Sequence, residues 1–139
     1  MNYLLDTCVI SELVSRRPAE KVVRWVDSVP EDRVYLSVIT IGEIKKGIEK
    51  LEEPERKATL AAWLEDELVP RFKSRLVPLD LDTLIEWGGL TARLEKTGRP
   101  LPAIDSLIAA SALHGDFVLV TRYLSDFAET GVQLLNPWD

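Results

Sequence analysis

Short apolar segments alternate with longer amphipathic segments along the whole chain, and this alternation constrains the fold more than any other feature. The apolar segments fit buried strands and lie at residues 3–5, 34–36, 76–79, 117–120 and 132–135. Helical patterns fill the intervals between them. Strands separated by helices predict an α/β fold, a mostly parallel sheet with a layer of helices on each face.

The predicted helices are marked by apolar residues at helical spacing. The first is expected to begin near Cys8 and to end before Pro18. The others are expected over 19–28, 41–51, 55–72, 83–96, 103–114 and around 126–129. No repeat, low-complexity tract or long Gly/Ser linker divides the 139 residues, so one domain covering 1–139 is predicted.

Composition excludes several classes of protein. No apolar run approaches the roughly 20 residues that cross a bilayer, so no association with membranes is expected. The first residues do not resemble a secretory signal and the single cysteine cannot form an internal disulfide, so a cytoplasmic location is expected. The net charge of −6 argues against a protein that coats nucleic acid, but it is compatible with a nuclease whose acidic pocket holds divalent cations.

Four acidic residues are predicted to meet at one edge of the sheet. Asp6 directly follows the first strand, and Glu43 is expected in the first turn of the third helix. Asp105 is expected in the first turn of a helix that begins near Pro102, and Asp126 follows the fourth strand. Because the carboxyl ends of parallel strands and the amino ends of the following helices share one edge, we expect the four carboxylates to lie there together.

A group of carboxylates needs a positive counterpart, because like charges a few ångströms apart repel and raise each other's pKa. Mg²⁺ and Mn²⁺ prefer oxygen ligands. A pair of such ions roughly 4 Å apart can activate water and stabilise the leaving oxygen in phosphodiester hydrolysis. No protein nucleophile is then needed, which fits a chain with one histidine and no Ser/His/Asp or Cys/His arrangement.

Each acid also has a purely structural interpretation. Asp6 could cap the first helix, and "TIGE", from Thr40 to Glu43, matches a capping box. Asp105 and Asp126 could complement helix dipoles. Phosphatases and receiver domains also place aspartates at strand ends, but the phosphatase pattern requires a second aspartate two residues after the first, which this chain lacks.

Five segments occur in the order and spacing of a known family: "LLDTCVISEL", "YLSVITIGEIKKGI", "GRPLPAIDSLIAASAL", "LVTRYLSDF" and "GVQLLNPW". Together they resemble the PIN-domain ribonucleases, specifically the VapC-type toxins of type II toxin–antitoxin pairs. The resemblance implies a three-layer fold around a five-stranded parallel sheet in the order 3-2-1-4-5. It also implies endonucleolytic cleavage of RNA with Mg²⁺, for which Mn²⁺ can substitute, leaving a 5′-phosphate and a 3′-hydroxyl.

Carried over residue by residue, the four metal-pocket acids of the family fall on Asp6, Glu43, Asp105 and Asp126, and its matching hydroxyl falls on Thr121. Cys8 and Tyr123 depart from the family pattern, because asparagine is usual at both positions. The second departure leaves an alternative function open. Tyr123 could block the pocket and leave a catalytically inactive scaffold that acts by binding proteins.

The resemblance implies protein partners as well as an RNA substrate. It implies a homodimer and a cognate VapB-type antitoxin, whose tail wraps the toxin's groove and places a basic side chain in the acidic pocket. Arg122, Lys46 and Arg99 are candidate contacts for RNA phosphates, with solvated surface charge as the alternative. Four tryptophans offer large apolar areas for protein contacts or for the core.

Overall fold

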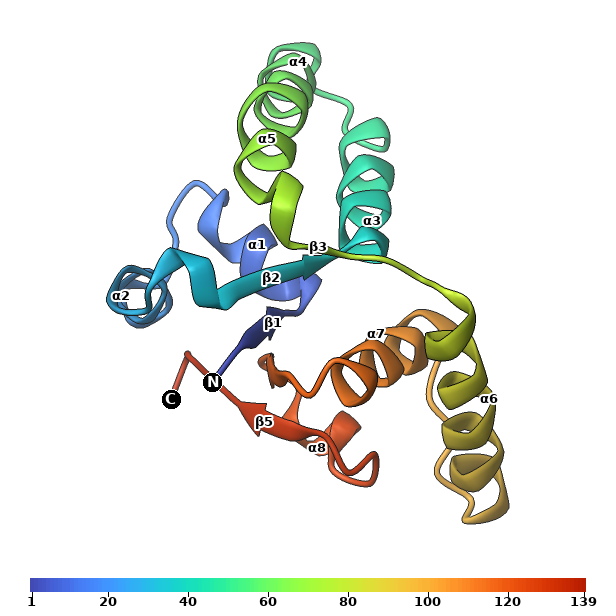
Figure 1. Ribbon diagram of the computed structural model, residues 1–139. Coiled ribbons are helices and arrows are strands. Elements are labelled where there is room, and N and C mark those ends of the chain that lie inside the picture. The colour runs from blue at the N-terminus through green and yellow to red at the C-terminus, as the bar shows by residue number, and fades with distance from the viewer.

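The computed structural model describes residues 1–139 and is built around a five-stranded sheet (Figure 1). The strands are β1 (Tyr3–Leu5), β2 (Val34–Ser37), β3 (Leu76–Val77), β4 (Val118–Val120) and β5 (Gln133–Leu135). All neighbouring pairs are parallel, and their order is β3-β2-β1-β4-β5. The predicted fold class and strand order are confirmed.

Helices cover both faces of this sheet. They are α1 (Thr7–Leu13), α2 (Glu20–Ser28), α3 (Val38–Glu49), α4 (Pro54–Trp63), α5 (Val69–Phe72), α6 (Leu81–Lys96), α7 (Ala103–His114) and α8 (Leu124–Phe127). Three short helical segments join them, η1 (Glu31–Arg33), η2 (Leu64–Leu68) and η3 (Lys73–Arg75). No helix is both long enough and apolar enough to span a membrane.

Two apolar cores lie on opposite faces of the sheet, and the central strand β1 contributes to both. Leu5 packs with side chains from α1, α2, α3, η2 and α5, whereas Leu4 packs with side chains from α6, α7 and α8. Successive residues of a strand point to opposite faces, so two adjacent leucines serve two layers. Complete burial of a leucine stabilises the fold by roughly 1.5–3 kcal/mol. The end of β1, where Asp6 follows, is therefore fixed from both sides.

The third helix starts earlier than predicted. Ser37 ends β2, and its side chain accepts a hydrogen bond of 3.0 Å from the Ile39 amide, so α3 begins at Val38 instead of residue 41. Strand and helix therefore join with no loop between them. Glu43 consequently lies in the second turn of α3, and its predicted place in the first turn is wrong.

A second helix also differs from the sequence prediction. The single helix predicted over 55–72 is divided by η2, a π-helical segment that separates α4 from α5. Pro70 follows this segment, and a proline inside a helix removes one backbone hydrogen bond and crowds the preceding turn. The first helix, by contrast, begins beside Cys8 and ends at Leu13, before Pro18, as predicted.

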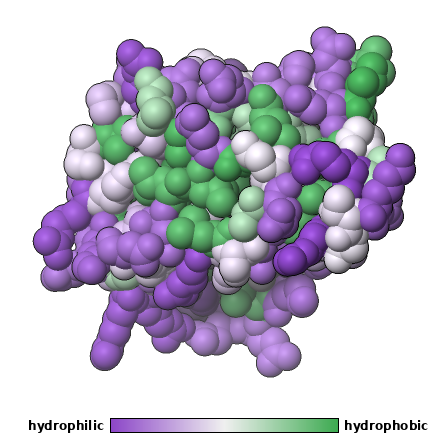
Figure 2. All heavy atoms as spheres, turned by 90° about the horizontal axis from the view of Figure 1, so that it is seen from below, coloured by the Kyte–Doolittle hydropathy of each residue, from purple (hydrophilic) through white to green (hydrophobic).

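The strand β5 forms one edge of the sheet and is only partly covered. Figure 2 shows the face that lies at the bottom of Figure 1, where hydrophobic side chains gather in the middle and hydrophilic side chains surround them. The opposite edge strand, β3, continues into the connection to α6 (Figure 1). The carboxyl ends of the central strands β1 and β4 lead into α1 and α8, which frame the site described next.

Candidate active site at the carboxyl edge of the sheet

One pocket of about 320 Å³ brings together the four predicted acids. Its lining consists of Asp6, Thr7, Cys8, Glu43, Asp105, Tyr123 and Asp126. The acids come from the end of β1 and from α3, α7 and α8. The prediction that they meet at the carboxyl edge of the sheet is therefore confirmed by their positions in the fold.

Asp6 is both a helix cap and a wall of the pocket. Its side chain accepts hydrogen bonds from the Thr7 amide (2.9 Å) and from the Thr121 hydroxyl (2.8 Å), and only 6% of the residue is exposed. Burial raises the pKa of Asp6, while the hydrogen bonds from Thr121 and Thr7 act in the opposite direction. The two interpretations of Asp6, structural and functional, are thus compatible.

Thr121 lies behind the pocket, beneath Asp6. It follows β4, is completely buried and does not line the cavity. Besides donating to Asp6, its hydroxyl oxygen accepts a hydrogen bond of 3.1 Å from the Tyr123 amide. Tyr123 is 48% exposed and lines the acidic pocket without closing it. Thr121 therefore acts on the site through Asp6.

Cys8 extends the polar contacts around Asp6. Its Sγ lies 3.7 Å from Asp6 Oδ2 and 3.7 Å from the Thr121 hydroxyl. Burial, followed by the charge of Asp6, raises the pKa of Cys8 to about 11. Because the thiolate is the reactive form of cysteine, this thiol is not a nucleophile at neutral pH.

Glu43 is held by a hydroxyl from α1. The Thr7 hydroxyl donates a hydrogen bond of 2.6 Å to Glu43 Oε1, and the same hydroxyl lies 3.0 Å from that of Thr40. The capping box suggested by the sequence is not formed, because Ser37 takes the capping position. The side chains of Glu43 and Thr40 are thereby available for contacts with α1.

Asp105 is half-buried in the first turn of α7, where it was predicted. Burial raises its pKa, and the charges of Asp6, Glu43 and Asp126 raise it further, in that order. Asp126 is exposed in the first turn of α8. The four carboxylates therefore influence one another electrostatically.

The donor set of the pocket suits a hard divalent cation. Four carboxylates offer oxygen ligands, and no lysine, arginine or histidine lines the cavity to neutralise them. No three acidic, histidine or cysteine side chains lie close enough together to form a ready-made ligand cluster. Like charges in one pocket repel one another, and a divalent cation bound among them would offset that repulsion.

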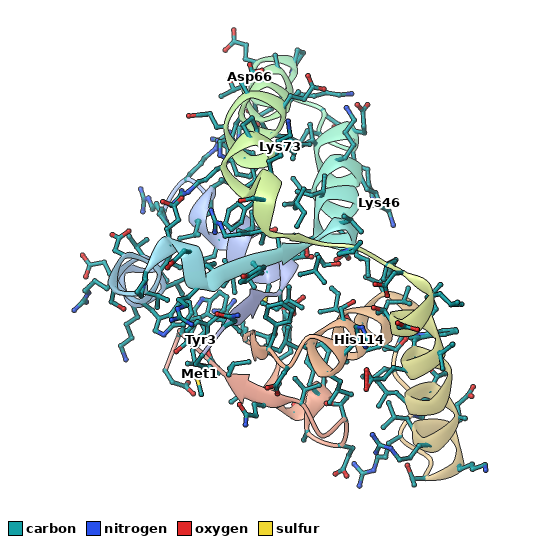
Figure 3. All side chains as sticks on the ribbon, in the orientation of Figure 1. Met1, Tyr3, Lys46, Asp66, Lys73 and His114 are labelled. Carbon is teal, nitrogen blue, oxygen red and sulfur yellow. The ribbon has the colours of Figure 1, made fainter.

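The three candidate phosphate contacts lie in different surroundings. The Arg122 guanidinium lies over the Trp138 ring, 4.7 Å from its centroid. Lys46 is exposed and projects from the outer side of α3 (Figure 3). Arg99 lines a second pocket of about 330 Å³, which also includes Asp105 and Asp126 and therefore adjoins the acidic pocket. Of the three, Arg99 is the one beside the acids.

The sequence predicts no role for Thr40 in the site beyond the suggested helix cap, and it predicts no contact between Thr7 and Glu43. A signal was available for Thr40, because it precedes Glu43 by three residues and so lies on the same side of the helix. The only indication that the sequence gives for Thr7 is its position directly after Asp6.

These features define a parallel α/β fold with an acidic site at the carboxyl edge of its central strands. Residues 3–131 match the family model described as PIN domain, and the chain belongs to that family. VapC ribonuclease Y4jK from Sinorhizobium fredii is 34% identical over 136 residues, covering 98% of this chain and 97% of the relative. Toxin FitB from Neisseria gonorrhoeae is 35% identical over 135 residues, 97% of each chain. The crystal structure of FitAcB from Neisseria gonorrhoeae matches with a TM-score of 0.94 and 34% identity over 98% of both chains.

Proposed function

We propose that the protein is a metal-dependent endoribonuclease and the toxin of a VapBC-type toxin–antitoxin pair. The observation that carries this proposal is the pocket in which four carboxylates gather without a basic residue in its lining. Membership of the PIN family supports it, as does the similarity to proteins named as a VapC ribonuclease and as the toxin FitB.

In the proposed mechanism, Asp6, Glu43 and Asp105 would hold Mg²⁺ or Mn²⁺, and Asp126 would complete the pocket or hold a second ion. A bound cation would supply the means to acidify a water molecule and to neutralise charge that develops on the phosphate. The chain supplies orientation, because Thr121 fixes Asp6 and Thr7 fixes Glu43 through hydrogen bonds. Cleavage of the phosphodiester bond then needs no protein nucleophile.

Arg99 is the proposed contact for a neighbouring RNA phosphate. Its backbone is fixed at the end of α6, since Gly98 adopts φ +73° and the Arg99 amide donates a hydrogen bond of 2.8 Å to the Leu94 carbonyl. Glycine adopts this left-handed conformation without steric cost. One phosphate of the strand would lie in the acidic pocket, and the next would lie beside Arg99 in the adjoining cavity.

The proposed protein partner is a VapB-type antitoxin. An apolar pocket of about 550 Å³, lined by 14 residues of which 10 are hydrophobic, lies among α1, α2, η2 and α5. Leu13, Val26 and Trp63 are part of its lining. An antitoxin segment could bury apolar side chains in this pocket and place a basic side chain among the four carboxylates.

The proposed homodimer uses exposed apolar side chains near the amino ends of three helices. They are Val38 on α3, Leu81, Leu84 and Ile85 on α6, and Ile104 on α7. Burial of these side chains between two copies of the chain would remove apolar surface from water, which favours association. Replacing Ile85, which is 65% exposed, with glutamate should convert a dimer to a monomer in light scattering, and an unchanged molar mass would contradict this assignment.

The nuclease is tested by incubating a mixed cellular RNA pool with the purified, antitoxin-free protein. The reactions contain Mg²⁺, Mn²⁺ or a chelator, and the Asp105→Asn variant is the control. Metal-dependent cleavage that the variant lacks would support the proposal. If wild type and variant were inactive in every metal, the inactive scaffold would be favoured, although the exposed ring of Tyr123 and the open pocket argue against a blocked site.

A further inference from the structure

Thr40 is a completely buried residue in the first turn of α3 whose hydroxyl has no role in the helix itself. Ser37 caps the helix, and the Thr40 hydroxyl donates to no carbonyl of α3. The serines of α7 behave differently, because Ser106 and Ser111 donate to the carbonyls of preceding residues of their own helix. A buried hydroxyl needs a hydrogen-bond partner, and Thr40 finds one on another helix, the Thr7 hydroxyl at 3.0 Å.

The number of available protons fixes the direction of the hydrogen bonds. The Thr7 hydroxyl has a single proton, which it donates to Glu43 Oε1 at 2.6 Å because an ionised carboxylate can only accept. Thr40 must then be the donor in its contact with Thr7. The result is a chain from Thr40 to Thr7 to Glu43, in which each hydrogen bond orients and polarises the next.

We propose that Thr40 is a positioning residue for Glu43. By donating to Thr7, it fixes the direction of the Thr7 proton and thereby holds the Glu43 carboxylate toward the pocket. A glutamate loses considerable rotamer freedom when it is ordered, so a carboxylate on this long side chain benefits from a fixed donor. This inference rests on the proposed function, in which Glu43 is a metal ligand.

Two variants separate the hydroxyl of Thr40 from its bulk. Thr40→Val removes the hydroxyl and keeps the branched shape, whereas Thr40→Ser keeps the hydroxyl. We expect Thr40→Val to weaken Mn²⁺ binding, measured by titration calorimetry, by about 10–100-fold, the usual effect of removing a group that orients a metal ligand. In a metal-free crystal structure of this variant, Glu43 should occupy more than one conformation. Thr40→Ser should bind Mn²⁺ like the wild type and keep Glu43 in place.

Specific outcomes would overturn the inference. One is wild-type Mn²⁺ affinity in Thr40→Val together with an unmoved Glu43, and another is equal loss of affinity in both variants, which would indicate a packing role. Thermal unfolding of the metal-free proteins verifies that all are folded. If the wild type itself neither bound Mn²⁺ nor cleaved RNA, the proposed function would fail. The conformation of Glu43 in the metal-free crystals would still decide whether Thr40 positions it.

Discussion

The Thr121 hydroxyl donates a hydrogen bond of 2.8 Å to Asp6 Oδ2, although 115 positions separate the two residues in the sequence. The register of the sheet produces this contact. Leu5 pairs with Val120 in the neighbouring parallel strands, so the next residue of each strand leaves the sheet at the same edge. Both side chains are buried, and a buried carboxylate requires hydrogen-bond donors.

Thr121→Val should therefore destabilise the protein and reduce its activity. The buried Asp6 carboxylate accepts hydrogen bonds from the Thr7 amide and from the Thr121 hydroxyl. The substitution would remove the second of these. Leaving a buried acceptor short of a partner costs about 1–3 kcal/mol in the free energy of unfolding. Urea unfolding measures this loss, and Thr121→Ser should restore most of it. Unfolding of Thr121→Val at the wild-type urea concentration would show that the contact contributes nothing.

The place of the acids was predictable from sequence because it depends on strand ends and helix starts. The residues after β1 and β4 follow short apolar segments that are easy to recognise, and the start of α7 is marked by Pro102. The start of α3 was less predictable, since Ser37 and Thr40 are both good capping residues and only the end of β2 decides between them. The contact between Thr7 and Thr40 joins two helices, so it depends on how these helices pack and has no signature in a local pattern.

Asp105→Asn should stabilise the metal-free protein at neutral pH while abolishing cleavage. No hydrogen bond compensates for the partial burial of this carboxylate, and the neighbouring acids repel it. The amide has nearly the same shape without the charge. We expect the midpoint of thermal unfolding to rise by about 2–4 °C, the effect of roughly 1 kcal/mol in a domain of this size. Asp66→Asn is the matched control, because Asp66 projects from η2 far from the pocket (Figure 3) and should leave the midpoint unchanged.

The stability advantage of Asp105→Asn should depend on pH. Burial, and then the charges of Asp6 and Glu43, raise the pKa of Asp105 above its ordinary value of 3.8. The folded protein consequently binds a proton more tightly than the unfolded chain, so stability is retained at low pH and falls as pH rises through the raised pKa. The asparagine side chain of the variant does not bind a proton in this pH range, so its contribution to stability does not change with pH. Its advantage over the wild type should be smallest below about pH 4 and grow toward neutral pH. An advantage that is constant from pH 3 to pH 7 would contradict the electrostatic explanation.

Arg99→Ala should weaken binding of RNA and leave the chemical step intact. Arg99 lies in the cavity beside the four acids but forms no ion pair, so its charge is available for a phosphate. Loss of one such contact should raise KM about tenfold, with little change in kcat. It should also reduce the dependence of log(kcat/KM) on log salt concentration by about one unit.

Arg24→Ala is the matched control, because Arg24 is an exposed arginine of α2 paired with Glu20, outside both cavities. Equal effects of the two substitutions on KM would mean that Arg99 contributes only to the overall charge. A loss of RNA binding confined to Arg99→Ala would place the substrate strand in the cavity between α6 and α8.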